Sequence, residues 1–296
     1  MSGVSLAETV LRSQTKEVTI GHGRPFCIIG ERINPTGRKK FAEELRGGEL
    51  STVSTDAVAQ VEAGADMLDV NAGIPLVDEA ELLKTMLRTV QTAVDVPICI
   101  DSSVIEALEA GLSVYEGRAL VNSVTAEDER LSEILPLVAR HGAAVIGLAN
   151  DETGIPETPK KRLECARKIV AAAADFGIAR DDVVIDPLAM TVGADPEAVR
   201  TTLRTISLIR DELGVNMSLG ASNVSFGLPD RPALNAGFLP MAMAAGLTSA
   251  IMSTARPVVD AVRAGDLLLG HDEWGANWIA AHRARQATLA QAAPVS

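Results

Sequence analysis

The sequence predicts a single-domain α/β fold, a TIM barrel with eight parallel strands, from three observations. Eight short apolar runs alternate with segments whose apolar residues recur at helical spacing. Polar residues stand at the trailing end of most of these runs. The chain has 296 residues, of which 47% are hydrophobic, enough for one barrel of about 250 residues. An open doubly wound sheet would give the same alternation, so pattern alone leaves that alternative open.

The strands are predicted from continuous apolar runs, which are typical of parallel strands buried on both faces. These runs cover residues 26–30, 67–71, 97–101, 119–122, 143–148, 183–187, 215–219 and 249–253. No internal repeat, low-complexity tract or interdomain linker interrupts them.

Helices are predicted between and after the strands, where apolar residues recur every three or four positions. They cover residues 53–63, 79–94, about 131–138, 160–177, 195–213, 234–246, 258–269 and 272–290, and a short helix is expected at 6–11. Gly177 is the expected end of one helix, and Asp195 with Pro196 the expected start of the next. Residues 1–24 then form an N-terminal extension, and residues 257–296 form closing helices and a tail.

Charge and hydropathy exclude two classes of partner. The formal net charge is −12 and the isoelectric point is near 4.9, with no basic run that would pair with phosphates, so we expect no nucleic acid. No run approaches the roughly 20 apolar residues of a membrane span, so we expect no membrane association. Residues 1–15 lack the order of a secretory signal, which favours a cytoplasmic protein.

The cysteines and histidines predict no metal site. Cys27, Cys99 and Cys165 are odd in number and widely spaced, which fits neither a disulfide framework nor a zinc motif. Cys27 and Cys99 fall inside apolar runs, so we expect buried, unreactive thiols. The four histidines are scattered, without paired spacing.

The polar residues at the strand ends are the candidate functional residues, because barrel enzymes place their active sites at the carboxyl ends of the strands. They are Glu31, Asp69, Asn71, Asp101, Asn122, Asn150, Asp186 and Asn223.

Asn223 lies in a small polar loop, residues 220–226, that follows the seventh predicted strand. Its amide carries both a donor and an acceptor, which suits a ligand atom that must be recognised before and after it gains a proton. The alternative is that Ser222, Asn223 and Ser225 only turn and cap a surface loop, because loops use such residues routinely.

Asp101 and Asp186 each follow an apolar run, which places both carboxyl groups at the barrel mouth. One alternative is helix capping, for which Asp101 before two serines is suitable. A second is a divalent metal, although no third acidic ligand shares a local motif with them. The functional interpretation is a heterocycle, because the two oxygens of a carboxylate match adjacent ring N–H and amino donors. The side-chain amide of Asn122 has both a donor and an acceptor, so it can bind a ring edge that carries both kinds of group.

Six motifs, in order and at similar spacing, resemble the methyltetrahydrofolate:corrinoid methyltransferases of the pterin-binding family. They are GERIN at 30–34, LDVNAG at 68–73, IDS at 100–102, VNS at 121–123, IDP at 185–187 and GASNVS at 220–225. Each motif alone is weak, but together they span about residues 28–254. The same family includes the folate domain of cobalamin-dependent methionine synthase and is related to dihydropteroate synthase.

The resemblance implies that Asp101, Asn122 and Asp186 hydrogen-bond the pterin, and that Asn223 lies nearest the methyl-bearing N5. The substrate would be tetrahydrofolate or 5-methyltetrahydrofolate, in one-carbon metabolism. The methyl group would be exchanged with a reduced corrinoid (cobalamin). This chain has no Asp-x-His-x-x-Gly corrinoid motif, so the corrinoid would arrive on a partner protein. The family commonly forms homodimers.

Seven further residues are expected to form a second layer or to hold the folate tail: Glu31, Asn34, Asp69, Asn71, Ser222, Ser225 and Arg231. Arg231 suits the anionic glutamate tail, and a solvated loop arginine is its alternative. The rival functions are a dihydropteroate synthase-like condensing enzyme and a non-catalytic folate-binding subunit. Only Arg231 and Arg256 are basic near the last two strand ends, where a diphosphate would need such residues.

Overall fold

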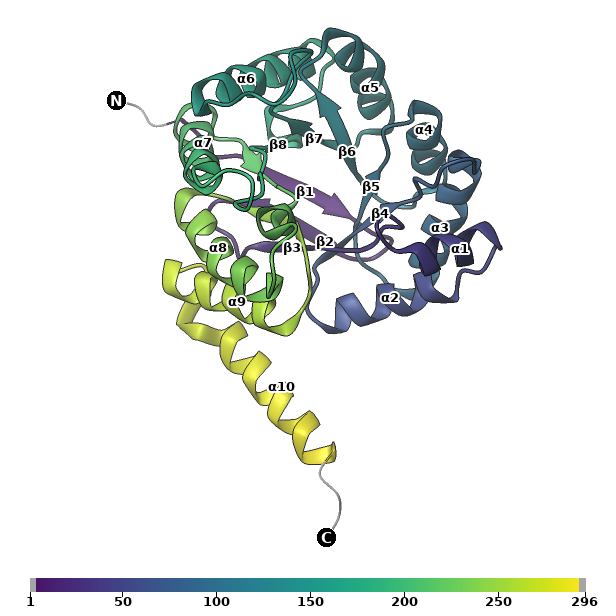
Figure 1. Ribbon diagram of the computed structural model, residues 1–296, viewed down its shortest axis with the longest axis vertical. Helices are drawn as coiled ribbons and strands as arrows, with labels where there is room; N and C mark the ends of the chain where they lie inside the picture. The colour runs from purple at the N-terminus through teal and green to yellow at the C-terminus, as the bar shows by residue number, and fades with distance from the viewer. Residues whose placement is uncertain (1–3, 293–296) are drawn as a thin grey trace.

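Eight strands form one parallel sheet that curls into a nearly closed barrel in the computed structural model, which describes residues 4–292 and side chains as far as residue 286. The neighbours run in the order β10-β3-β4-β5-β6-β7-β8-β9, and a parallel bridge between Gly220 and Ile251 links the two outer strands. Figure 1 shows the helices as a ring around the strands. The predicted TIM barrel is therefore confirmed.

The barrel strands follow the predicted apolar runs closely. Their bounds are β3 (Cys27–Ile33), β4 (Met67–Asn71), β5 (Ile98–Asp101), β6 (Leu120–Thr125), β7 (Ala144–Leu148), β8 (Val183–Asp186), β9 (Asn216–Met217) and β10 (Ser249–Met252). Most of their residues are buried, because the inner faces fill the barrel and the outer faces pack against helices. The seventh run forms only a two-residue strand, which continues into the loop of Asn223.

Some of the helices that surround the barrel begin or end at ordinary capping signals. Their bounds are α1 (Lys39–Arg46), α2 (Ser51–Glu62), α3 (Glu79–Ala93), α4 (Ile105–Val114), α5 (Asp128–His141), α6 (Pro159–Asp175), α7 (Ala198–Leu213), α8 (Arg231–Ala245), α9 (Arg256–Leu269) and α10 (Ala276–Ala292). The side chains of Asp78 and Thr158 cap α3 and α6. Gly142 and Gly214 adopt the left-handed conformation that ends α5 and α7.

The N-terminal segment corrects one prediction. The helix expected at 6–11 is wrong, because these residues belong to a hairpin of β1 (Glu8–Arg12) and β2 (Glu17–Gly21). The hairpin lies under the amino ends of the barrel strands, where Leu11 and Ile20 pack into the interior cluster. In Figure 1 it crosses the centre of the ring. The extension therefore closes one end of the barrel.

The helix predictions also change at three places, whereas the cysteine prediction does not. α1 and α4 were not predicted. α7 begins at Ala198, after Asp195 accepts a hydrogen bond from the Glu197 amide in a preceding turn. The thiols of Cys27 and Cys99 are buried, as expected.

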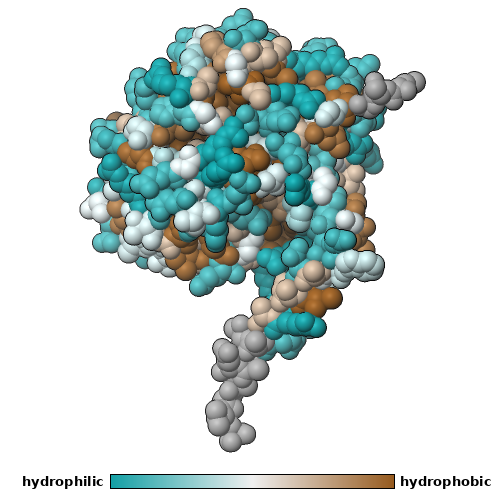
Figure 2. Space-filling view, turned by 180° about the vertical axis from the view of Figure 1, so that it is seen from behind, coloured by the Kyte–Doolittle hydropathy of each residue, from teal (hydrophilic) through white to brown (hydrophobic). Residues whose placement is uncertain are grey.

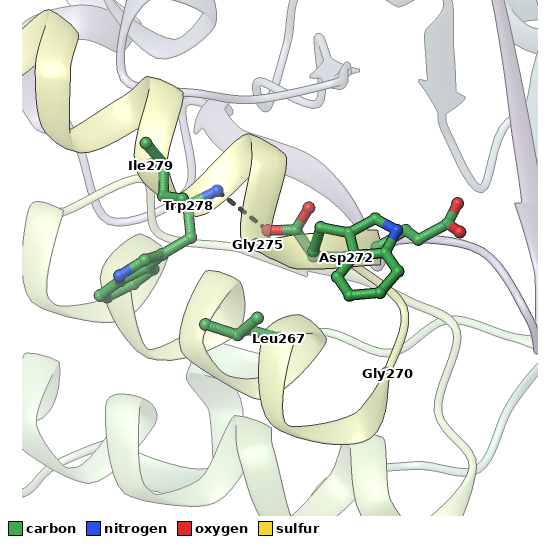
Figure 3. Close-up of a pocket in the computed structure, with 8 residues that line it drawn as sticks. Leu267, Gly270, Asp272, Gly275, Trp278 and Ile279 are labelled. Carbon is green, nitrogen blue, oxygen red and sulfur yellow. Dashed lines mark hydrogen bonds between the residues drawn. The ribbon is translucent and has the colours of Figure 1, made fainter.

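α10 extends away from the barrel as an arm, which is visible in Figures 1 and 2. The Asp272 carboxylate accepts hydrogen bonds from the amides of Asn277 (3.0 Å) and Trp278 (2.9 Å) and so caps the helix. Figure 3 shows Trp278, Ile279 and Leu267 around a hollow at this junction, on the outside of the barrel. The predicted tail includes residues 293–296, which lie outside the described residues. Within residues 4–292, none of the helices has the length and apolar composition of a membrane span.

Candidate functional site

Three polar side chains stand side by side at the barrel mouth because of strand register. Asn71 at the end of β4 pairs with Asp101 at the end of β5, and Asp101 pairs in turn with Asn122 on β6. The Asn71 side chain donates a hydrogen bond to the Asp101 carboxylate, and its own Oδ1 accepts one from the Gly73 amide at 2.8 Å. All three side chains are half-buried, so they face the mouth without being open to bulk water.

Asp69 lies beneath this row, with only 2% of its surface exposed. It accepts a hydrogen bond from Asn122 Nδ2 at 3.3 Å and contacts the side chains of Asp101 and Cys99. Burial, followed by the charge of Asp101, raises the pKa of Asp69 well above its usual value. Burial also raises the pKa of Asp101 to about 6, although hydrogen bonds from Asn71 and Asp69 oppose the shift.

Asp186 ends β8 on the opposite side of the barrel, in register with Leu148 of β7. Its Oδ1 accepts a hydrogen bond from the Leu188 amide at 2.7 Å, and its carboxylate also accepts one from the Gly220 amide. Burial raises its pKa to about 7, and the more distant charge of Arg162 offsets only part of this. Asp186 therefore holds a proton for much of the time near neutral pH and is tied to the loop that begins at Gly220.

Asn223 lies in that loop, a single 3₁₀ segment, η2 (Ala221–Ser225). Its neighbours Ser222 and Ser225 are buried, whereas Asn223 is exposed at the mouth. The Asn223 backbone closes two turns of the segment, donating to Gly220 O and accepting from the Phe226 amide at 3.1 Å each. The Asn223 side chain therefore projects from a short 3₁₀ segment that its own backbone hydrogen bonds hold.

A hydrogen-bond network fixes the loop from below. Ser222 Oγ donates to Glu31 Oε1 at 2.8 Å, and Asn235 Nδ2 donates to Ser222 Oγ at 3.3 Å. Arg231 donates to Ser225 Oγ at 3.1 Å and to the Ser222 carbonyl at 2.8 Å. Burial raises the pKa of Glu31. Arg231 therefore contacts the loop, although its side chain is also exposed to solvent.

The contacts place the predicted residues in two groups. Asp69, Asn71, Asp101 and Asn122 contact one another, and Glu31, Asp186, Ser222, Ser225 and Arg231 contact or form part of the loop of Asn223. Among the described contacts, Asn34 and Asn150 join neither group: Asn34 Oδ1 accepts from the Thr36 amide at 2.9 Å and serves the turn after β3, and the Asn150 carbonyl accepts from the Ala126 amide at 2.8 Å. Asp101 does not cap α4, where Ser102 Oγ instead accepts from the Val104 amide. Among the residues whose side chains are described, no three His, Cys, Asp or Glu groups are arranged to hold a metal.

Two contributors were not assigned a role from the sequence. Asn235, on α8, is buried against Ser222 and its Oδ1 has no partner. Arg162, on α6, donates to the carbonyl oxygens of Pro187 (3.0 Å) and Leu188 (2.7 Å), which supports the segment after Asp186. Neither residue has a local signal that marks it, because both act on loops distant in sequence.

The mouth therefore presents carboxyl and amide groups from several strand ends. Such a set fits a flat ring whose edge carries N–H and amino donors, and it does not fit a phosphate group. A family comparison supports the same conclusion. Residues 30–253 match the model of the family described as pterin binding enzyme.

The chain belongs to the pterin-binding enzyme family. It is 34% identical over 254 residues to the methylcorrinoid:tetrahydrofolate methyltransferase of Eubacterium limosum, covering 83% of this chain and 92% of that protein. It is also 34% identical over 242 residues to methionine synthase of Mycobacterium tuberculosis. That match covers 77% of this chain but only 20% of the methionine synthase. The prediction of an enzyme of this family is confirmed.

Solved structures confirm the fold. A dihydropteroate synthase from Yersinia pestis superposes with a TM-score of 0.68 at 15% identity, covering 88% of this chain and 99% of that chain. One from Xanthomonas albilineans superposes with a TM-score of 0.67 at 18% identity, covering 88% and 98%. At such identities the likeness concerns the barrel alone.

Proposed function

We propose that this protein transfers a methyl group between N5 of tetrahydrofolate and the cobalt of a corrinoid carried by a separate protein. The observation that carries the proposal is the match to nearly the whole of one methylcorrinoid:tetrahydrofolate methyltransferase, with acceptor groups at the mouth in the same chain. Asp101, Asn122 and Asp186 bind the donor-rich edge of the pterin, and Asn223 stands next to N5.

The pterin edge carries N–H and amino donors, which carboxylates and amide oxygens bind directionally. Asp101 and Asp186 lie on opposite sides of the barrel end, on β5 and β8, so they address the ring from two directions. The remaining predicted residues act through others, because Glu31, Ser222, Ser225 and Arg231 hold the loop of Asn223.

The tertiary amine at N5 leaves readily only when it is protonated, so the site must accommodate a cationic ring in the transition state. The Asn223 amide offers an oxygen to the N5–H cation and adds no fixed charge. Asp186 is joined to the same loop, because its carboxylate accepts a hydrogen bond from the Gly220 amide. The corrinoid supplies the nucleophilic cobalt when the methyl group leaves folate.

A partner that carries the corrinoid needs a surface around the mouth. Large apolar side chains are exposed in five of the loops that follow barrel strands, and others are exposed elsewhere on the protein. They are Leu76, Val104, Ile155, Met190 and Phe226. This apolar rim suits a partner that covers the mouth and excludes water during transfer.

The test is a spectroscopic assay without the natural partner. 5-Methyltetrahydrofolate is mixed anaerobically with chemically reduced Co(I) cobalamin, and the cobalt spectrum is followed; the reverse assay uses methylcobalamin and tetrahydrofolate. Transfer in either direction supports the proposal. Condensation of p-aminobenzoate with a pterin diphosphate, without methyl transfer, would select the dihydropteroate synthase alternative. Folate binding without turnover, even with corrinoid proteins added, would select the non-catalytic alternative.

A further inference from the structure

Asp69 has no assigned role in the proposed reaction, although it is the most enclosed acid at the mouth. Only 2% of its surface is exposed, and it lies in hydrogen-bond contact with Asp101, Asn122 and Cys99. Among the described side chains, no hydrogen bond or ion pair connects Asp69 or Asp101 to a lysine, arginine or histidine. The pair is buried without a neutralising cation.

Two carboxyl groups in hydrogen-bond contact need a proton between them, because two ionised carboxylates repel each other and neither can donate. The proton belongs on the group that is harder to hydrate. Asp69 is the deeper of the two, whereas Asp101 is half-buried at the mouth and receives a further hydrogen bond from Asn71. Asp69 is therefore the neutral acid and Asp101 the carboxylate.

The neighbouring amides are oriented by the same arrangement. Asn122 donates through Nδ2 to Asp69 Oδ1, which leaves its own oxygen for the mouth. Asn71 accepts from Gly73 with its oxygen, so its amino group is directed to Asp101. A neutral Asp69 thus donates through one oxygen to Asp101 and accepts through the other from Asn122.

We propose that Asp69 is a positioning residue that fixes Asp101 and Asn122 as hydrogen-bond acceptors toward the donor edge of the ligand ring. This inference rests on the proposed function for the identity of the ligand, a folate. Asp69 itself does not touch the ring. It sets the hydrogen-bond direction of the two groups that do.

The first test is the pH dependence of 5-methyltetrahydrofolate affinity in the wild type and in Asp69→Asn. The amide of the variant donates to Asp101 and accepts from Asn122 but cannot lose a proton, so its affinity near pH 6.5 should stay within about threefold of wild type. As the pH rises through the elevated pKa of Asp69, the wild type should weaken by about tenfold relative to the variant. Cys99, Asp101 and Glu79 are the other titratable groups facing the pair. The same pH series in Cys99→Ala distinguishes titration of the Cys99 thiol from titration of Asp69.

A second variant and a second readout keep the test decisive. Asp69→Leu removes both hydrogen bonds and should weaken binding by about ten- to a hundredfold. The infrared carbonyl band of a protonated carboxyl group, recorded on ligand-free protein at each pH of the affinity series, should contain a component that is present in wild type and absent in Asp69→Asn.

The inference is overturned if wild type and Asp69→Asn show the same pH profile, or if that component of the infrared band survives in the variant. Failure of the proposed function looks different. In that case the wild type would bind no folate at any pH, while the infrared comparison would still report on the proton of Asp69.

Discussion

The two ends of the barrel are built from the same eight strands but treat polar groups in opposite ways. At the amino end, the hairpin fills the interior with Leu11 and Ile20, and its charged residues form surface ion pairs such as Arg12 with Glu17 at 2.9 Å. At the carboxyl end, Asp69, Asp101 and Asp186 are enclosed and their pKa values are raised. The hairpin closes one end by apolar packing, whereas the other end gathers the candidate site residues.

This difference distinguishes the residues that stabilise the fold from those that serve the candidate site. Enclosed acids with raised pKa values weaken the fold as they ionise, and their retention is expected where a ligand completes them. The amino end also holds a buried acid, Asp66, whose pKa burial raises to about 6, but its carboxylate accepts a hydrogen bond from the Ile28 amide at 2.9 Å, and the hairpin at this end adds apolar packing. Variants at the two ends should therefore separate loss of stability from loss of activity.

The largest effect is expected from Leu11→Ala at the amino end. Leu11 is fully buried, and removing a buried leucine side chain typically lowers the free energy of unfolding by about 2 to 5 kcal/mol. Denaturant titration measures this, and Leu6→Ala, at a position 51% exposed, is the matched control. The folded fraction should retain its methyl-transfer rate. A variant that is as stable as wild type would show that the hairpin does not close the barrel.

Asn223→Ala should lower the methyl-transfer rate without lowering stability. Removing one preorganised contact to a developing charge typically costs about 2.7 to 4 kcal/mol of transition-state stabilisation, or a hundredfold to a thousandfold in rate. The transfer rate at saturating folate is the measurement, with Gln14→Ala, an amide at the amino end, as control. Stability should hardly change, because Asn223 is exposed. If affinity falls in proportion and the saturated rate is kept, Asn223 only binds.

The difference between the two ends of the barrel could be predicted only in part from the sequence. The strands and the polar residues at their ends followed from continuous apolar runs, since a parallel strand buried on both faces leaves few alternatives. The hairpin was missed because residues 6–11 contain too few apolar positions to distinguish helical from alternating periodicity. The contact between Asp69 and Asp101 depends on strand register, which spacing along the chain does not specify.

The residues that hold the Asn223 loop could not be predicted from the sequence either. Asn235 and Glu31 meet at Ser222 from helix α8 and strand β3, which are far apart in the chain. Arg231 was assigned to the folate tail or to solvent, and its additional hydrogen bonds to the loop could not be foreseen. Residues that touch a ligand tend to lie in recognisable motifs, whereas the residues that hold them become apparent only when the chain is folded.

Asp101→Ala gives an intermediate effect on binding. Removing an acceptor that hydrogen-bonds the ring should weaken 5-methyltetrahydrofolate binding by about 1.5 to 3 kcal/mol, measured by calorimetry. Asp95→Ala is the control from the other end, where Asp95 accepts hydrogen bonds from Ser13 and Thr15 and has a lowered pKa. We expect the control to bind folate normally. Equal affinity of folded Asp101→Ala and wild type would contradict the assignment of the pterin site.

The smallest effect concerns the pH dependence of stability in Asp186→Asn. The pKa of Asp186 is raised from 3.8 to about 7, so the folded state binds its proton more tightly than the unfolded state. The free energy of unfolding of the wild type should therefore decrease as the pH rises from about 4 to 7, whereas the variant lacks this titration. Because the side chain is half-buried and reached by water from the mouth, we expect a relative loss of about 1 kcal/mol for wild type between pH 5 and pH 8. Denaturant titrations of both proteins at the two pH values give the difference directly. If the free energies of unfolding of wild type and Asp186→Asn change in parallel with pH, Asp186 is ionised over the whole pH range in the folded protein, and its pKa is not raised.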